Sequence, residues 1–377
     1  MLMYLDIIGS CNLKCPSCPI GNSINKNNNK SMNLDLLKSI AKKSHLEGVS
    51  SIHLYNWTEP LIHPKIGEFI NEIEGLGISC GVSSNLNIAK NIEQTIKANP
   101  SFFRISLSGY HQETYAKGHA GGNIENVKNN MIILSEIKRK FKSKTRVQVY
   151  YHRYLDNSDE ETLMKHFAEG LGFEFASEFA FMMPLEKLFQ ACDAPVTLTE
   201  RDRKIISRLA LPPSKEVFNI TRQYKDMTCS LRDSQLTLDC EGNVILCCGV
   251  FEQKNNLVGK YTEIPLDKIQ RIKNTRDDLT SRCTKCMENG THVYAQCPSY
   301  KDLRDFSSKT FIEHKANQIG VSVFAKRGSD NFDEETYLRK NPDVQKAVFN
   351  GHFRSGYDHY LQFGKNEIAA GHRSSLD

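Results

Sequence analysis

Cys11-Asn12-Leu13-Lys14-Cys15-Pro16-Ser17-Cys18 is the stretch around which this 377-residue chain is organised. Three thiols at such short spacings can converge on one soft metal centre. A structural zinc ion or an electron-transfer cluster normally takes four protein ligands, so three leave one coordination position open for chemistry. The triad by itself also allows three ordinary thiols or half of a zinc site.

The residues before the triad predict where it lies in the fold. Residues 3–8 form a strand-like segment that ends at Gly9-Ser10, so the thiols should lie on a loop at the carboxyl end of a strand. Barrel-like α/β folds keep their active sites at this edge. From residue 1 to about 183, short apolar strands alternate with amphipathic helical stretches, a pattern typical of parallel βα units. The predicted strands are 3–8, 51–55, 78–82, 104–107, 146–151 and 174–179, and the clearest helices are 34–44, 66–76 and 125–141.

The C-x3-C-x2-C spacing resembles the signature of the radical S-adenosylmethionine (SAM) enzymes, although Ser17 stands where that family usually has an aromatic residue. The resemblance implies that Cys11, Cys15 and Cys18 hold a [4Fe-4S] cluster whose fourth iron chelates SAM. It implies an α/β fold with a partial (β/α)6 TIM-like barrel. It also implies reductive cleavage of SAM to a 5′-deoxyadenosyl radical that abstracts hydrogen from the substrate, with a low-potential electron donor such as flavodoxin or ferredoxin.

Polar residues at three predicted strand ends match places where that family binds SAM. Residues 56–60 correspond to its Gly-Gly-Glu element, with Trp57 and Thr58 in place of the glycines, and the next strand ends in a segment similar to Thr-Asn-Gly. Ser and Asn also favour such positions as ordinary turns and caps. Their order behind the triad favours SAM binding, while no catalytic residue and no role for His119 are assigned. The resemblance predicts SAM contacts from Glu59, Ser84, Asn85, Ser106 and Ser108.

A second cysteine set begins at Cys229, which precedes a predicted β-hairpin at 235–238 and 244–248 with a turn at Glu241-Gly242-Asn243. A further strand at 256–260 and a helix at 266–274 then lead to a C-x2-C pair. Four converging thiolates suit zinc or a [4Fe-4S] cluster. The layout resembles the twitch module, a short form of the SPASM extension, and is similar to the butirosin-pathway aminocyclitol dehydrogenase of this family. The resemblance implies a second, auxiliary [4Fe-4S] cluster on Cys229, Cys247, Cys283 and Cys286.

Four regions are therefore expected along the chain. They are a radical SAM core (1–183), a bridging helical segment (184–228), a small α+β twitch or SPASM-type domain (229–319) and a C-terminal helical appendage (320–377). The appendage should contain two or three short helices. It resembles a small module that accompanies glycosyltransferases and other glycan-pathway proteins, and it is either a docking module or a packed cap.

Composition restricts the class of protein. A net charge of +5, spread over 49 basic and 44 acidic side chains, is too mild to indicate nucleic acid or a membrane surface as partner. The sequence contains no apolar run of membrane-spanning length and no leader segment, so a cytoplasmic location is expected. Twelve cysteines in a reducing compartment suit metal binding better than disulfides.

The combined prediction is a radical SAM oxidoreductase or epimerase acting on a small-molecule substrate, namely a sugar, cyclitol or glycan intermediate. A peptide-modifying SPASM enzyme is the alternative, and an iron–sulfur or zinc protein without turnover is the alternative outside the enzymes. Cys192 and Cys297 are candidate hydrogen donors for an epimerase, or else structural thiols. Five cysteines outside the two sets are too few for a third four-cysteine cluster, so about eight irons per chain are expected; they are Cys80, Cys192, Cys240, Cys248 and Cys297.

Overall fold

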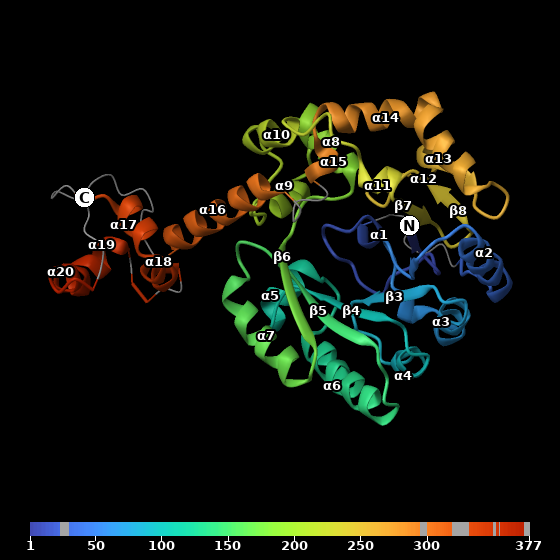
Figure 1. The fold of residues 1–377 in the computed structure, drawn as a ribbon, viewed down its shortest axis with the longest axis horizontal. Helices are drawn as coiled ribbons and strands as arrows, with labels where there is room; N and C mark the ends of the chain where they lie inside the picture. Colours follow the sequence, from blue (N-terminus) through green and yellow to red (C-terminus); the bar gives the residue numbers. More distant parts are fainter. Residues whose placement is uncertain (23–29, 295–299, 319–331, 350–351, 354, 373–377) are drawn as a thin grey trace. The chain divides into compact units, whose positions relative to one another are not determined.

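The computed structural model describes residues 1–22, 30–294, 300–318, 332–349, 352–353 and 355–372. Its centre is a nine-stranded sheet with the order β6-β5-β4-β3-β2-β1-β7-β8-β9 (Figure 1). The first six strands pair in sequence order, and every pair among them is parallel. These six strands are β1 (Leu2–Leu5), β2 (Ser51–His53), β3 (Ser79–Ser84), β4 (Phe102–Leu107), β5 (Arg146–Arg153) and β6 (Glu174–Phe179).

Helices follow the parallel strands, as the alternating pattern predicts. The side chain of Asn33 begins α2 (Leu34–Leu46) by accepting a hydrogen bond from the backbone N–H of Leu36 at 2.8 Å. Apolar residues at helical spacing face the sheet, so the predicted partial (β/α)6 barrel is confirmed. The other helices of this half are α1 (Pro19–Asn22), α3 (Ile66–Gly75), α4 (Ile92–Lys97), α5 (Gln112–Gly118), α6 (Ile124–Lys140) and α7 (Glu161–Gly170), with 3-10 turns η1 (Pro60–Ile62) and η2 (Ser158–Glu160).

The predicted hairpin continues the same sheet. β7 (Gln235–Leu238) pairs in parallel with β1, and β8 (Asn243–Ile245) and β9 (Leu257–Lys260) follow antiparallel. Gly242 has a φ of 76° in the turn between β7 and β8, a conformation that glycine adopts without strain. β8 is shorter than the predicted 244–248, so Cys247 and Cys248 lie beyond its end.

Short helices make up most of the chain between β6 and residue 303. The bridging region is helical, as predicted, with α8 (Leu185–Asp193), the 3-10 turn η3 (Pro195–Thr197), α9 (Glu200–Ile206) and α10 (Lys215–Arg222). The C-x2-C pair follows the predicted helix at 266–274, as expected, but it lies inside a further helix that the sequence did not predict. The remaining helices are α11 (Ser230–Asp233), α12 (Gln253–Asn256), α13 (Leu266–Thr275), α14 (Asp277–Glu288), α15 (Thr291–Tyr294) and α16 (Lys301–Gln318).

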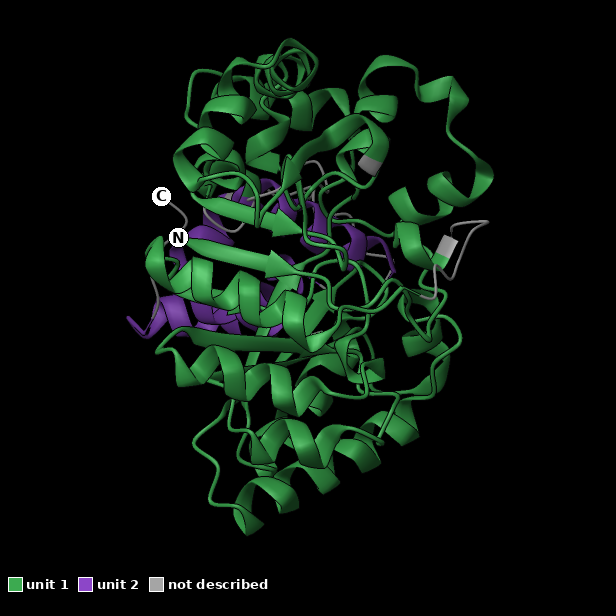
Figure 2. Cartoon of the chain, turned by 90° about the vertical axis from the view of Figure 1, so that its right-hand side faces the viewer, with its two compact units in different colours: residues 1–303 green, residues 304–377 purple. Residues whose placement is uncertain are grey.

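The chain forms two compact units, residues 1–303 and 304–377 (Figure 2). Unit 1 contains the whole sheet, the predicted core and the predicted auxiliary region as far as residue 303, whereas the rest of that region belongs to unit 2. Unit 2 has its own small core of Phe332, Tyr337 and Val344. Among the described residues no helix is both long and apolar enough to cross a membrane. The helices of the predicted appendage are α17 (Glu334–Lys340), α18 (Pro342–Phe349), α19 (Gly356–His359) and α20 (Lys365–Ala369), with a π-helical turn η5 (Tyr360–Gly364) between the last two.

Candidate active site and auxiliary cluster site

The cysteine triad lies on the loop between β1 and α1, at the carboxyl edge of the parallel strands. Backbone hydrogen bonds hold this loop: the N–H of Lys14 donates to the carbonyl of Ala120 at 2.7 Å, and the N–H of Cys18 donates to that of Cys15 at 3.1 Å. A Cβ at Gly21 would lie 2.8 Å from the backbone nitrogen of Cys15. Glycine is therefore needed where α1 approaches the triad.

The three thiols are close enough to disfavour one another's ionisation. Burial raises the pKa of Cys11 to about 12, and it also raises the pKa values of Cys15 and Cys18. The neighbouring Cys18 and Cys11 raise the pKa of Cys15 further. Three thiolates therefore need a bound cation, which fits an iron–sulfur cluster. In the described part of the chain no three Cys, His, Asp or Glu side chains converge on a single ion; in a cubane each thiolate binds an iron of its own.

Glu59 connects the triad loop with the ends of β2 and β3. Its side chain is buried, and its two oxygens accept hydrogen bonds from the backbone N–H groups of Leu61 at 3.0 Å and Asn85 at 2.8 Å. Burial raises the pKa of Glu59 to about 7, against the hydrogen bonds from Asn85, Ser84 and Leu61. The Asn85 amide nitrogen lies 3.9 Å from the sulfur of Cys11. Glu59, Ser84 and Asn85 are thus gathered beside the triad.

Ser106 and Ser108 have different surroundings. The hydroxyl of Ser106 hydrogen-bonds Nε2 of His152 at 2.9 Å, and that of Ser108 hydrogen-bonds Nδ1 of His119 at 2.9 Å. Burial lowers the pKa of His119 to about 4 and that of His152 to about 3, so both rings are neutral near pH 7. His119 also stacks on Tyr115, with ring centroids 5.0 Å apart. Contact of the two serines with SAM stays a prediction.

Asp6 is a positioning residue that the sequence analysis missed. It is buried one residue after β1, and its Oδ1 accepts hydrogen bonds from the backbone N–H groups of Asn56, Trp57 and Thr58 at 3.0 to 3.2 Å. The Thr58 hydroxyl adds a fourth at 2.6 Å. Asp6 thereby holds the segment that leads into Glu59. The available signal was an acidic residue within an otherwise apolar strand pattern.

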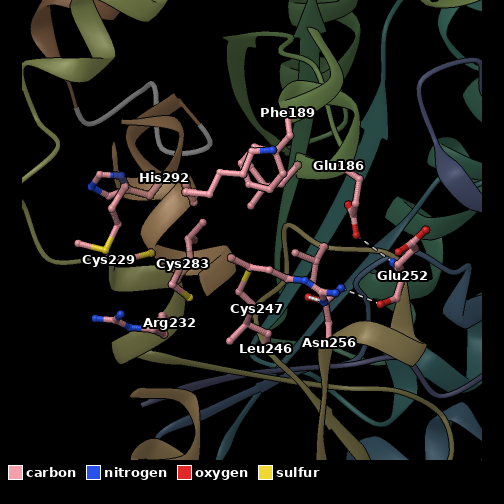
Figure 3. Close-up of a pocket in the computed structure, with 17 residues that line it drawn as sticks. Glu186, Phe189, Cys229, Arg232, Leu246, Cys247, Glu252, Asn256, Cys283 and His292 are labelled. Atoms are coloured by element: carbon pink, nitrogen blue, oxygen red, sulfur yellow. Dashed lines mark hydrogen bonds between the residues drawn. The ribbon is translucent and has the colours of Figure 1, made fainter. Parts of the chain in front are cut away.

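The second cysteine set lines one cavity of about 230 Å³ (Figure 3). Cys229 precedes α11 and Cys247 follows β8, while Cys283 and Cys286 lie one turn apart on α14. Residues three apart on a helix share one face, so both thiols of the helix reach the cavity. The hydroxyl of Thr291 donates to the sulfur of Cys286 at 3.0 Å. All four residues of the predicted auxiliary set therefore meet at one place.

Charged side chains surround this cavity, and more of them are basic than acidic. Arg232, Arg282 and Lys285 line it together with Glu186 and Glu252, and Lys273 of α13 is buried beside it. The ammonium of Lys273 donates to the carbonyls of Arg232 at 3.3 Å and Gln235 at 3.0 Å. Burial lowers the pKa of Lys273 to about 8, and the nearby cysteines oppose that shift. The positive charge suits four thiolates and the anionic cluster that they would hold.

The cysteines outside the two sets are dispersed. Cys80 is buried in β3, as predicted, and Cys192 is half-buried in α8. Cys240 lines a separate cavity of about 410 Å³ at the carboxyl ends of β1, β2 and β7. The sulfur of Cys248 lies 3.5 Å from Oε1 of Gln235, and Cys248 does not line the auxiliary cavity. Cys297 lies outside the described residues.

Residues 5–164 match the model of the Radical SAM superfamily. This match identifies a radical SAM domain, which contains the triad together with Glu59, Ser84, Asn85, Ser106 and Ser108. A domain of this superfamily implies a [4Fe-4S] cluster, SAM and an external reductant. A comparison with curated proteins finds no match.

Solved structures of several radical SAM enzymes resemble this chain. Native anSMEcpe with bound AdoMet matches with a TM-score of 0.50 and 13% identity, over 84% of this chain and 97% of that one. *Streptococcus suis* SuiB bound to S-adenosylmethionine matches with a TM-score of 0.49 and 13% identity, over 76% and 71%. BtrN in complex with AdoMet and 2-DOIA matches with a TM-score of 0.43 and 15% identity, over 77% and 87%. At these identities the likeness to anSMEcpe concerns the fold.

Proposed function

We propose that this radical SAM enzyme oxidises or epimerises a small polar substrate, namely a sugar, a cyclitol or a glycan intermediate. The observation that carries the proposal is the pairing of a three-cysteine loop at the carboxyl edge of a partial barrel with a four-cysteine cavity elsewhere in the same unit. That short layout and the helical C-terminal unit both favour the glycan-related class. An external low-potential donor such as flavodoxin or ferredoxin would supply the electron.

At the barrel edge, Cys11, Cys15 and Cys18 would hold the SAM-binding cluster. Glu59 is placed to accept a hydrogen bond from the SAM amino group, because each carboxylate oxygen has more than one acceptor site and only part of that capacity is used. Asn85 lies between Glu59 and Cys11, where its amide can orient a bound carboxylate. When bound, the reduced cluster and SAM supply the 5′-deoxyadenosyl radical that takes hydrogen from the substrate.

Cys229, Cys247, Cys283 and Cys286 would hold an auxiliary [4Fe-4S] cluster. A closed four-thiolate site has no position for SAM, so its suitable role is to accept or relay an electron. Lys273 and Arg232 stabilise negative charge there, since both lie near the thiols.

The test is deuterium transfer under anaerobic conditions. Reconstituted, reduced protein is incubated with SAM and with perdeuterated sugars and cyclitols, and 5′-deoxyadenosine is analysed by mass spectrometry. Deuterium in 5′-deoxyadenosine from one of these compounds is the expected result. An oxidised product would identify a dehydrogenase, whereas solvent hydrogen at an inverted carbon would identify an epimerase. Transfer only from a ribosomal peptide would contradict the proposal and favour the peptide-modifying alternative.

A further inference from the structure

The inner face of the barrel is polar and open to water. Along β4 the residues Phe103, Ile105 and Leu107 are fully buried, whereas Arg104 and Ser106 between them are partly exposed. β5, which lies beside β4 in the sheet (Figure 1), shows the same alternation. Successive strand residues point to opposite faces, and the helices of a barrel lie outside, so the partly exposed set faces the lumen.

Arg104 is a half-buried cation on the lumen face of β4. Its guanidinium lies over two aromatic rings, with Cζ 4.8 Å from the ring centroid of Tyr55 on one side of the barrel and 5.1 Å from that of Tyr150 on the other. Its Nε donates to the hydroxyl of Ser83 at 3.1 Å. Across the described residues, no carboxylate forms an ion pair with Arg104. The remaining donors of its planar fork therefore have no anionic partner.

The groups around Arg104 are neutral near pH 7. Tyr4 of β1 and Tyr55 keep their phenolic protons, because burial raises the pKa of both. Burial, with a smaller contribution from the charge of Arg104, lowers the pKa of His53 to about 4 and that of His152 to about 3. On the side of β7, Thr237 is in register with Tyr4, and its hydroxyl has no hydrogen-bond partner in the described part of the structure. None of these neighbours carries a negative charge that compensates Arg104; the same face of the sheet also carries Glu174 and Glu178 of β6, in register with Gln148 and His152.

Arg104 lies on β4 below the residues that are predicted to contact SAM. Arg104 precedes Ser106 by two residues and Ser108 by four on the strand that rises toward the carboxyl edge. At roughly 3.3 Å per residue, its Cα lies about 7 Å and about 13 Å below those positions. A molecule of monosaccharide size that is anchored at Arg104 therefore extends toward the triad, with its far end near Glu59 and Asn85.

We propose that Arg104 binds an anionic group of the substrate, a carboxylate or a phosphate. The guanidinium fork matches the planar geometry of both groups and binds them through paired hydrogen bonds. Tyr55 and Tyr150 hold the fork in place, and Ser83 occupies its Nε. The substrate class then narrows from a neutral sugar or cyclitol to an acidic one, such as a uronic acid or a sugar phosphate. This step rests on the proposed function for where the reacting carbon lies, although anion binding is measurable without turnover.

The experiment is ligand binding by the full-length, anaerobically reconstituted protein with SAM, followed by calorimetry and thermal shift. The probes are inorganic phosphate and acetate, then glucose 6-phosphate, glucuronate and glucose. The wild type should bind one acidic sugar at least about tenfold more tightly than glucose, in line with a charge-assisted paired contact. The phosphate and carboxylate probes distinguish the two anion sources. Arg104→Gln should remove the preference.

Arg146→Gln is the matched control, because Arg146 is also a strand arginine over an aromatic ring, but it is exposed and paired with Glu174 at 3.0 Å. It should bind every probe as the wild type does. If Arg104→Gln does not fold, as judged by iron content and circular dichroism, Arg104→Lys takes its place in the binding measurements. That variant should lose about threefold or more in affinity for the acidic sugar and none for glucose.

Equal binding of anions by the wild type and the Arg104 variants overturns the inference, as does a wild type that shows no preference for any acidic probe. The proposed function fails by a separate measurement, namely the absence of deuterium transfer from sugars and cyclitols. The two failures are therefore distinguishable.

Discussion

The two cysteine sites of this protein are built in opposite ways. The triad comes from one eight-residue segment of a single loop, whereas the auxiliary set comes from the start of α11, the end of β8 and α14. Their electrostatic surroundings also differ. Burial raises the pKa of both Cys11 and Cys283, but the neighbouring Glu59 adds to the rise at Cys11, whereas Arg232 opposes it at Cys283. An open site with an acidic neighbour suits a cationic ligand such as SAM, and a closed site among cations suits a cluster that takes only electrons.

The largest effect is expected from a substitution in the triad, the open site. Replacing Cys15 by Ala should abolish formation of 5′-deoxyadenosine, because a cluster with two protein ligands is no longer held for SAM. Iron should fall from about eight to about four atoms per chain. Chromatography of the reaction and an iron assay measure the two results. The control variant Cys80→Ala removes a buried thiol from the same sheet. It should keep both the formation of 5′-deoxyadenosine and the iron content of the wild type. Wild-type rates in the Cys11, Cys15 and Cys18 triple variant would refute the site.

The next effect isolates the closed site. The double variant Cys283→Ala, Cys286→Ala should also retain about four irons, but these should belong to the SAM-binding cluster on the triad. In electron paramagnetic resonance spectra of this variant, the signal of the triad cluster, which shifts on addition of SAM, should remain. The signal of the auxiliary cluster should be absent. Wild-type protein with about four irons and one zinc would show a structural zinc site instead. About twelve irons would show a third cluster.

A smaller effect concerns the acidic neighbour of the triad. Glu59→Gln should weaken SAM binding by about 10- to 100-fold, the range for a hydrogen bond to a charged group. The pKa of Glu59 is raised to about 7, so the carboxylate forms as the pH rises through that value, and wild-type affinity for SAM should rise with it. Calorimetry at about pH 6, 7 and 8 tests this, since the variant should lack that dependence. An equal rise in both proteins would contradict the role of Glu59.

The raised pKa of Glu59 gives the stability of the SAM-free protein the opposite pH dependence: affinity for SAM should rise with pH, whereas stability should fall. The pKa of this carboxyl is higher in the folded state than the usual 4.5, so between pH 4.5 and about 7 the folded state binds more protons than the unfolded one. The contribution of Glu59 to the free energy of unfolding is therefore full below pH 4.5 and is lost as the pH rises through about 7.

The smallest effect concerns the cations of the closed site. Lys273→Met should lower the free energy of unfolding by about 1 to 3 kcal/mol, because it leaves the buried carbonyls of Arg232 and Gln235 without their donor. Thermal unfolding of the reconstituted protein measures this. Lys268→Met, on the exposed face of the same helix, is the control and should have little effect. Equal losses in the two variants would show that the buried ammonium is not needed.

The sequence predicts the first half of the fold well, because periodicity is a local property. Six strands and the helices at 34–46, 66–75 and 124–140 lie where alternating and helical patterns place them, within a few residues. The triad is visible for the same reason, since its three ligands are neighbours along the chain. The strand at Gln235–Leu238 was also predicted correctly, because its sequence pattern is local.

What the sequence did not predict depends on contacts between distant residues. Pairing of β7 with β1, the placement of the C-x2-C pair inside α14, and the histidine partners of Ser106 and Ser108 all arise from packing. The positioning role of Asp6 and the buried charge of Lys273 have no spacing signal.

The sequence by itself thus determined the class of chemistry, because three clustered cysteines bring their own geometry to any loop. Only the tertiary structure decided the charge around each site. Electrostatic interaction depends on distance in space and on exclusion of water, and neither can be read along a chain. Arg104 shows this most directly: in the sequence it is one of 49 basic residues, and in the structure it is a cation that faces the inside of the barrel.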